Sequence, residues 1–169
     1  MKKSKAKNVA LFGVMVALAF TLSYFESLIP FNFGVPGVKL GLANLVVVVA
    51  LYIMKPYEAL AIAVIRIFLA GMTFGNFYSL AYSLCGGLLS FAVMFLVKKT
   101  KLSIIGVSML GGICHNIGQI IVAAIVMKTA RIAYYLPVLL VAGLITGLLM
   151  GIVSKITVER FSKISKTRY

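Results

Sequence analysis

Apolar stretches separated by short polar connections dominate the pattern along the chain. Most of these stretches are close to the roughly 20 residues that a helix needs to cross about 30 Å of hydrocarbon. The pattern therefore predicts an all-α membrane protein with six transmembrane helices in one bundle. The predicted spans are Val9–Phe25, Leu40–Met54, Tyr57–Met72, Phe77–Val97, Leu102–Met127 and Ile132–Ile156.

The distribution of basic residues predicts the orientation of these spans. Of the 17 Lys and Arg residues, one falls inside a span, three fall in the first, third and fifth connections, and the others fall at the termini and in the second and fourth connections. Basic residues accumulate on the cytoplasmic side of membrane proteins. We therefore expect both termini to be cytoplasmic and the first, third and fifth connections to face outward.

Composition narrows the class of protein further. The formal net charge of +14 on a soluble fold would suggest a nucleic-acid partner, but 62% apolar residues arranged as membrane spans exclude that class. Neither a linker nor a low-complexity stretch divides the chain, so residues 1–169 form a single integral membrane domain embedded in the lipid bilayer. The first span resembles a signal peptide, but bulky residues follow its apolar centre, and we expect a retained helix.

The first outward connection, 27–39, contains two prolines and two glycines but is also rich in apolar residues. A linker exposed to water would be more polar. The connection either folds back over the outer mouth of the bundle as a lid or re-entrant cap, or rests as a short loop on the lipid headgroups. The other two outward connections are too short to cover a site.

Arg66 is the one basic residue within a predicted span, about 14 Å from the cytoplasmic entry of its helix. A charge at this depth is unfavourable, and no acidic residue lies within any predicted span to neutralise it. Arg66 either reaches Glu26 or helix-end carbonyls, or it holds an anionic or carbonyl-bearing ligand.

Three hydrogen-bonding residues of the fifth span add to this polar group. His115 and Gln119 are four residues apart and share a helix face, and Asn116 lies beside them. A lone buried histidine is often a structural residue, but three such side chains within five residues of a membrane helix favour a binding role.

Further polar residues from other spans are expected at a similar depth, in the outer half of the membrane. Asn44 lies near the outer end of the second span, close to Lys39 in the preceding connection, and Tyr82 lies in the first turns of the fourth span. An aromatic belt at the interface explains Tyr134 and Tyr135, but not the amides, Arg66 or His115. We therefore predict an outward-opening polar pocket for an organic solute. Its residues are Lys39, Asn44, Arg66, Tyr82, His115, Asn116 and Gln119.

Small residues predict where helices meet, because they permit the close backbone approach on which helix association in lipid depends. Gly143, Gly147 and Gly151 recur every four residues in the sixth span, and we expect them to pack inside the bundle. Gly13 and Ala17 form a similar pair in the first span. This pair serves either internal packing or the docking of another membrane subunit.

Several runs of residues form motifs that are specific to one protein family. These runs are Pro36–Asn44, Tyr82–Ser90, Ile105–Ser108, His115–Gln119 and Tyr134–Pro137. They resemble the Gx transporter family, whose members are often labelled heptaprenyl diphosphate synthase component I, and the resemblance covers residues from about 8 to 156. A wider likeness is to the substrate-binding S-components of energy-coupling factor transporters.

The resemblance implies a six-helix protein in the bacterial cell membrane that captures a vitamin-like micronutrient or cofactor precursor from the outer face. It also implies partners, namely a transmembrane T-component and two ATPases that use ATP. Gly13 and Ala17 match the superfamily's contact with the T-component, although glycine replaces the usual first alanine. The roles of Lys39, Asn44 and His115 carry over by their positions in the matching motifs.

Enzymatic activity is not expected. A prenyl diphosphate synthase needs clustered carboxylates to hold Mg²⁺, and this chain has no Asp and three scattered Glu residues. It also lacks a phosphate-binding Gly-Lys-Ser/Thr loop, so the chain is expected to have no intrinsic cofactor, no metal site and no catalytic residues. Two alternatives remain: a non-catalytic membrane subunit associated with polyprenyl diphosphate or quinone synthesis, and a membrane electron-transfer subunit that binds flavin or quinone.

Overall fold

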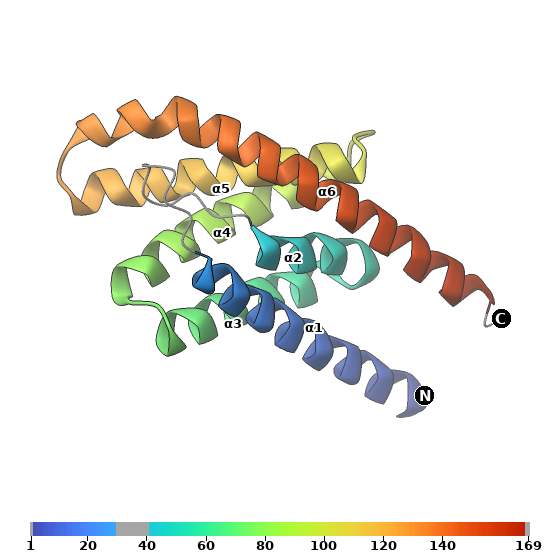
Figure 1. The fold of residues 1–169 in the computed structure, drawn as a ribbon. Helices are drawn as coiled ribbons and strands as arrows, with labels where there is room; N and C mark the ends of the chain where they lie inside the picture. The colour runs from blue at the N-terminus through green and yellow to red at the C-terminus, as the bar shows by residue number, and fades with distance from the viewer. Residues whose placement is uncertain (1, 30–40, 168–169) are drawn as a thin grey trace.

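The computed structural model describes residues 2–29 and 41–167, and Lys39 with most of the first connection lies outside them. Within these ranges the fold is helical (Figure 1). Five of the α-helices are long and apolar enough to cross a membrane, which identifies a multi-pass membrane protein. The elements are α1 (Lys2–Leu28), α2 (Leu42–Ile53), α3 (Pro56–Thr73), α4 (Phe77–Val97), α5 (Ile104–Val126), the 3₁₀ helix η1 (Ala130–Tyr135) and α6 (Leu136–Thr167).

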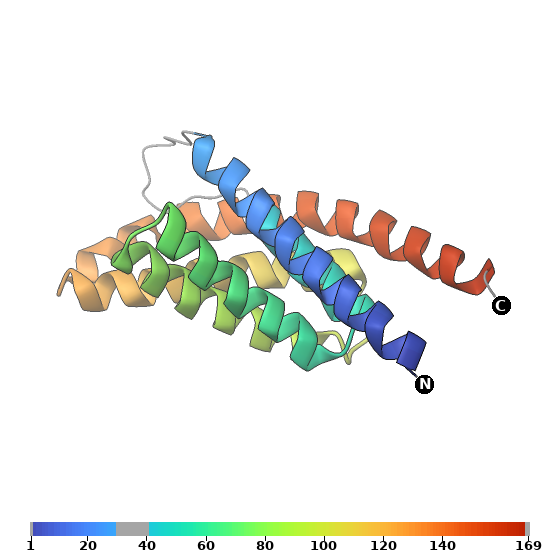
Figure 2. The ribbon, with the colours of Figure 1, turned by 90° about the horizontal axis from the view of Figure 1, so that it is seen from below.

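Successive helices run in alternating directions through the bundle. α1 begins and α6 ends at the same end of the molecule, together with the α2–α3 and α4–α5 connections (Figures 1 and 2). The α3–α4 and α5–α6 connections lie at the opposite end. This arrangement agrees with the predicted order of the helices, and the side of the membrane that each end faces remains a prediction.

Helix boundaries follow local capping chemistry. The Asn76 side chain accepts a 2.8 Å hydrogen bond from the Ser79 N–H and starts α4, and Ser103 accepts one from the Gly106 N–H and starts α5. Pro137 lies in the first turn of α6. An N–H at this position would have no partner within the helix, so proline is tolerated there. The sixth α-helix consequently starts at Leu136, four residues later than the predicted span, and η1 precedes it.

α2 departs from the prediction of six membrane-spanning helices. It has 12 residues, which correspond to about 18 Å, so it is too short to cross the hydrocarbon region alone. Its side chains are buried on all sides, from Val46 to Leu51 without interruption, against α1, α3 and α6. The apolar run that looked like a lipid-facing span is therefore a core helix, because a helix that is apolar all round is enclosed by protein.

Lys98, just after α4, closes the end of this core helix. Its ammonium group donates a 2.6 Å hydrogen bond to the Leu51 carbonyl oxygen and lies 4.9 Å from the centre of the Tyr52 ring. Burial lowers the pKa of Lys98 below its ordinary value. The last carbonyls of a helix have no partner within the helix, so a cation placed there stabilises the helix end.

Replacing this cap should destabilise the bundle. Because Lys98→Met removes one charge-assisted hydrogen bond at a partly exposed site, we expect the free energy of unfolding to fall by about 1 kcal/mol. Denaturant unfolding in a mild detergent measures the change. Lys101→Met, at an exposed lysine in the same connection, is the control, and equal effects of the two substitutions would contradict the capping role.

Glycines bring α4, α5 and α6 into close contact. A Cβ atom at Gly118 would lie 2.8 Å from the Gly86 Cα atom of α4, and one at Gly147 would lie 2.7 Å from the Met109 Cα atom of α5. Gly143 and Gly151 are equally close to the α5 backbone. The prediction that the glycines of the last helix pack inside the bundle is confirmed, and the backbones of these three helices approach closely.

Candidate functional site

A polar cavity of about 160 Å³ lies inside the bundle, and all six α-helices contribute to its wall. Each helix supplies at least one side chain that can form a hydrogen bond or carry a charge. Placing polar groups from several membrane helices together is energetically unfavourable and is typical of functional sites. The polar lining comprises Ser23, Glu26, Ser27, Asn44, Arg66, Ser79, Ser83, His115, Asn116 and Thr146.

Arg66 is the cation of this cavity. It projects from α3, the side chain is partly buried, and its Nε atom is fully buried. Among the described residues, no acceptor forms a hydrogen bond with Nε. A guanidinium presents five donors in a planar fork that fits a carboxylate or phosphate. Arg66 therefore retains the capacity to bind an anionic or carbonyl-bearing group in the cavity.

Glu26 is the carboxylate in the same cavity. It lies near the end of α1 and interacts electrostatically with Arg66. One of its oxygens also accepts a hydrogen bond from the Gly41 backbone N–H at the start of α2. Gly41 has a φ of 74°, a left-handed conformation that suits glycine. Glu26 thus partly balances the Arg66 charge and also ties together the two helices that flank the first connection.

The residues of α5 occupy the wall next to α4 and α6. His115 packs against Gly86 of α4, because a Cβ atom built on Gly86 would lie 3.2 Å from the His115 Cε1 atom. Asn116 donates a 2.6 Å hydrogen bond from Nδ2 to the Leu139 carbonyl oxygen of α6. Asn116 therefore holds α6 in place in addition to lining the cavity.

Hydroxyl groups complete the lining, and sequence reasoning did not select them. The Ser23 hydroxyl donates to the Ala19 carbonyl oxygen of its own helix, and the Thr146 hydroxyl donates to that of Ala142, both at 2.9 Å. Their lone pairs remain able to accept hydrogen bonds. Ser23 and Glu26 are three residues apart and therefore lie on one face of the helix. This polar face near the end of the first span could have indicated Ser23 as a lining residue.

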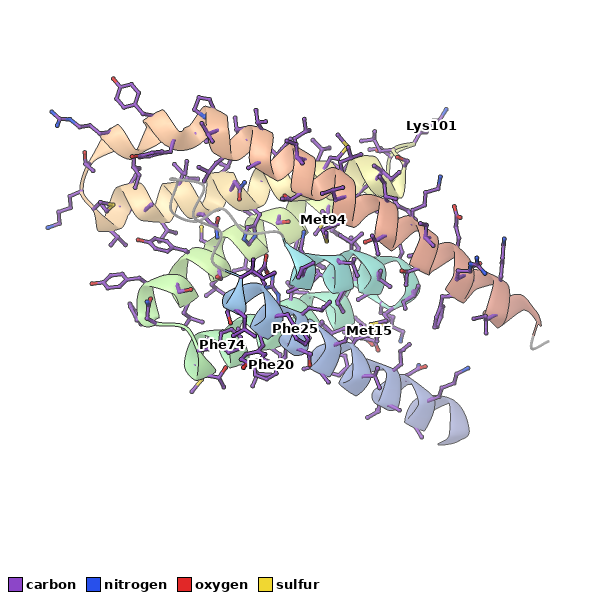
Figure 3. The ribbon with its side chains drawn as sticks, in the orientation of Figure 1. Met15, Phe20, Phe25, Phe74, Met94 and Lys101 are labelled. Atoms are coloured by element: carbon purple, nitrogen blue, oxygen red, sulfur yellow. The ribbon has the colours of Figure 1, made fainter. Side chains whose placement is uncertain are left out.

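Aromatic side chains meet at the junction of α1 and α3. The Phe74 ring lies 5.7 Å from the ring centres of both Phe20 and Tyr24, and Figure 3 shows Phe74 beside Phe20. Phe74 also lines the cavity. Aromatic pairs at this spacing pack favourably, so Phe74 forms an apolar part of the wall that is held by α1.

Tyr82 and Gln119 do not reach this cavity. They line a separate, larger cavity between α4, α5, η1 and α6. Sequence reasoning placed all seven candidate residues in a single pocket. The structure brings four of them together, assigns these two to a second cavity, and does not describe Lys39. The four that share the polar cavity are Asn44, Arg66, His115 and Asn116.

The small residues of α1 lie on an uncovered face. Ala10, Gly13 and Ala17 are all exposed, and no described atom outside the helix lies within 4 Å of a Cβ atom built at Gly13. Residues three and four apart on a helix lie on one face. Internal packing therefore does not account for this pair, in contrast to the glycines of α6.

Comparison with protein families gives one match. The model of a family described as heptaprenyl diphosphate synthase component I matches residues 15–157, which is most of the chain. No curated protein and no solved structure matches significantly.

Proposed function

We propose a transport role for this chain, which belongs to the heptaprenyl diphosphate synthase component I family. In this proposal it is the substrate-binding S-component of an energy-coupling factor-type uptake transporter. It captures a small organic micronutrient or cofactor precursor from the outer face of the membrane. The polar cavity around Arg66 is the observation that carries the proposal.

The size and chemistry of the cavity support the capture of a solute. A single water needs about 10–15 Å³ on the scale of these volumes, so the 160 Å³ cavity has room for a small organic molecule. Arg66 offers a fork of donors, Asn44 and His115 offer neutral hydrogen bonds, and Phe74 offers an apolar wall. This combination suits a small molecule with one anionic or carbonyl-bearing group.

The uncovered face of α1 supports dependence on a partner. Membrane helices associate where small residues allow close approach, and Gly13 and Ala17 present such a surface. The chain has no phosphate-binding loop of its own. The proposal therefore assigns the use of ATP to two ATPases, and assigns contact with this chain to a transmembrane T-component that docks on α1.

Native mass spectrometry after gentle detergent extraction tests the proposal. We expect the parent protein to retain one small solute, which is then identified from its mass. We expect the T-component and ATPases to co-purify with the chain. A preparation that retains no solute when extracted from cells grown in rich medium, and that co-purifies with no ATPase, would contradict the proposal.

The family description supports a second candidate function, a non-catalytic membrane subunit associated with polyprenyl diphosphate synthesis. The same purification separates the two candidates, because a soluble prenyl synthase would then co-purify in place of the ATPases. The three glutamates, Glu26, Glu58 and Glu159, lie on three different helices, so this candidate assigns catalysis to the partner.

The orientation of the protein gives a further prediction. In a cysteine-free background, Val35→Cys should react with an impermeant thiol reagent on intact cells, because the first connection is expected outside. Lys163→Cys should react only after the membrane is permeabilised, because the basic end of the bundle is expected inside. The reverse pattern would show that the orientation is wrong.

A further inference from the structure

The second cavity has a volume of about 550 Å³ and lies between α4, α5, η1 and the start of α6. Ligand pockets commonly measure roughly 300–1,000 Å³ and combine apolar walls with a few polar groups. This cavity has that composition. Its apolar wall comprises Ile120, Ala123, Met127, Ile132 and Leu139, and its polar and aromatic residues are Tyr82, Gln119, Thr129, Arg131, Tyr134 and Tyr135.

Gln119 provides a polar group inside this apolar wall. The side chain is 7% exposed, and its Oε1 atom is fully buried. No described residue donates a hydrogen bond to that oxygen. An unpaired buried acceptor is unfavourable, and rotation about the last side-chain torsion would present the amide to a ligand that supplies an N–H or O–H group.

Arg131 provides a cation at the rim of the cavity. It belongs to η1 and is exposed, and its backbone N–H donates to the Thr129 hydroxyl oxygen at 3.3 Å. None of the three glutamates of the chain lines this cavity, and the chain contains no aspartate. The Arg131 charge is therefore free of a nearby carboxylate and complements an anionic group.

The second cavity is separate from the polar cavity around Arg66. The two share no lining residue among the described parts of the chain. The hydrogen bond from Asn116 to Leu139 crosses the wall between them. His115 and Gln119 stand next to each other against Gly86 and face different cavities. Occupation of one cavity thus leaves the other available.

We propose that the second cavity is a binding site for an anionic amphiphile. Its apolar body lies between Ile120, Ala123 and Leu139, a hydrogen-bond donor on that body meets Gln119, and its anionic group meets Arg131. Gln119 lies seven residues, or about 10 Å, before the end of α5, and Arg131 follows that end in η1, so the two polar contacts fall at different ends of the ligand. A soluble amphiphilic anion and an anionic membrane lipid share this chemistry.

The dye 2-anilinonaphthalene-6-sulfonate has the required groups: fused rings, one N–H donor, and a sulfonate at the opposite end of the rings. We expect the purified protein to bind one dye molecule saturably above the background of empty micelles, as measured by fluorescence titration. Naphthalene-2-sulfonate, which lacks the N–H, should bind more weakly. N-phenyl-2-naphthylamine, which lacks the sulfonate, should also bind more weakly.

Substitutions then locate the dye. Ala123→Phe fills the cavity and should weaken binding at least tenfold, whereas Ile125→Phe, at a 69% exposed position of the same helix that does not line the cavity, should leave it unchanged. Gln119→Leu should weaken binding of the anilino dye about two- to tenfold and leave naphthalene-2-sulfonate unaffected. Arg131→Gln should weaken binding of the sulfonates up to about fivefold and leave the uncharged amine unaffected.

Unchanged dye affinity in Ala123→Phe, or equal losses in Ala123→Phe and Ile125→Phe, would overturn the proposal. If Ala123→Phe fails to fold, the other two variants test the proposal. Gln119→Leu should then affect only the dye that has the N–H, and Arg131→Gln should affect only the sulfonates. Equal effects on all three compounds would overturn the proposal. Arg66→Lys should not change dye binding, so failure at this site is distinguishable from failure of the proposed solute site.

The source of the natural ligand is decided in nanodiscs. If a lipid occupies the site, saturable dye binding in phosphatidylcholine discs should be lost in phosphatidylglycerol discs. If a soluble anion occupies it, the dye should bind in both. Either result supports a binding site for an anionic amphiphile. Absence of saturable dye binding in both kinds of disc would overturn the proposal.

Discussion

Arg66→Lys is expected to abolish most retention of the natural solute while the protein still extracts as a monodisperse species. Lysine keeps the positive charge but loses the planar fork of donors. Loss of a hydrogen bond to a charged group costs about 1.5–3 kcal/mol, which corresponds to about a 10- to 150-fold loss of affinity. Native mass spectrometry of the co-extracted solute measures the change.

Two further variants test whether the loss of retention comes from the cavity. Arg160→Lys changes an exposed arginine of α6 in the same way and should leave retention unchanged. Arg66→Ala should lose retention as well, but it also removes the electrostatic partner of Glu26, so extraction and unfolding must be measured beside it. Full retention of the solute by Arg66→Lys would show that Arg66 has a purely structural role.

Bulky side chains on the uncovered face of α1 are expected to abolish ATP-driven uptake and to leave solute retention intact. Gly13→Leu places a large group where no described atom outside the helix is near, and Ala17→Trp does so at an exposed position, so the bundle itself should not change. A partner helix that approaches closely would be displaced. Uptake of the identified solute by the complete complex in liposomes is the measurement.

Leu88→Trp, at a 42% exposed position of α4, is the matched control for a bulky change on an exposed surface and should leave uptake intact. Gly147→Leu is the opposite control, because a side chain there would collide with the α5 backbone and should destabilise the bundle. Normal uptake by Ala17→Trp would argue against docking on α1. Uptake by the isolated chain without ATPases would argue against the whole assignment.

Much of the fold was readable from the sequence because long apolar runs leave few alternatives. The helices α2 to α5 begin and end within a few residues of the predicted spans, whereas α1 begins earlier than predicted and α6 begins and ends later. Hydropathy did not distinguish a lipid-facing helix from a protein-enclosed one, since Val46 to Leu51 are apolar in either setting. The short length of α2 was visible, but its burial on every side depended on contacts with distant helices.

The candidate site was readable only in part for a similar reason. Depth along each helix placed Asn44, Arg66 and His115 at a common level, and they do share a cavity. Position along a helix does not specify how far a cavity extends. Gln119 shares a helix face with His115 but lies one turn further along α5, where it lines the second cavity. Ser23 and Thr146 were missed because single hydroxyls are common in membrane helices.

The enclosure of α2 also bears on the order in which the protein is made. Its buried surface is completed by α6, where the Ser154 hydroxyl donates to the Leu45 carbonyl oxygen at 3.5 Å, across 109 residues of sequence. Until the ribosome has released the last helix, this part of α2 lacks its native neighbour. The second helix therefore reaches its native place at the end of biosynthesis, and any chain truncated before α6 would present an incomplete core to membrane quality control.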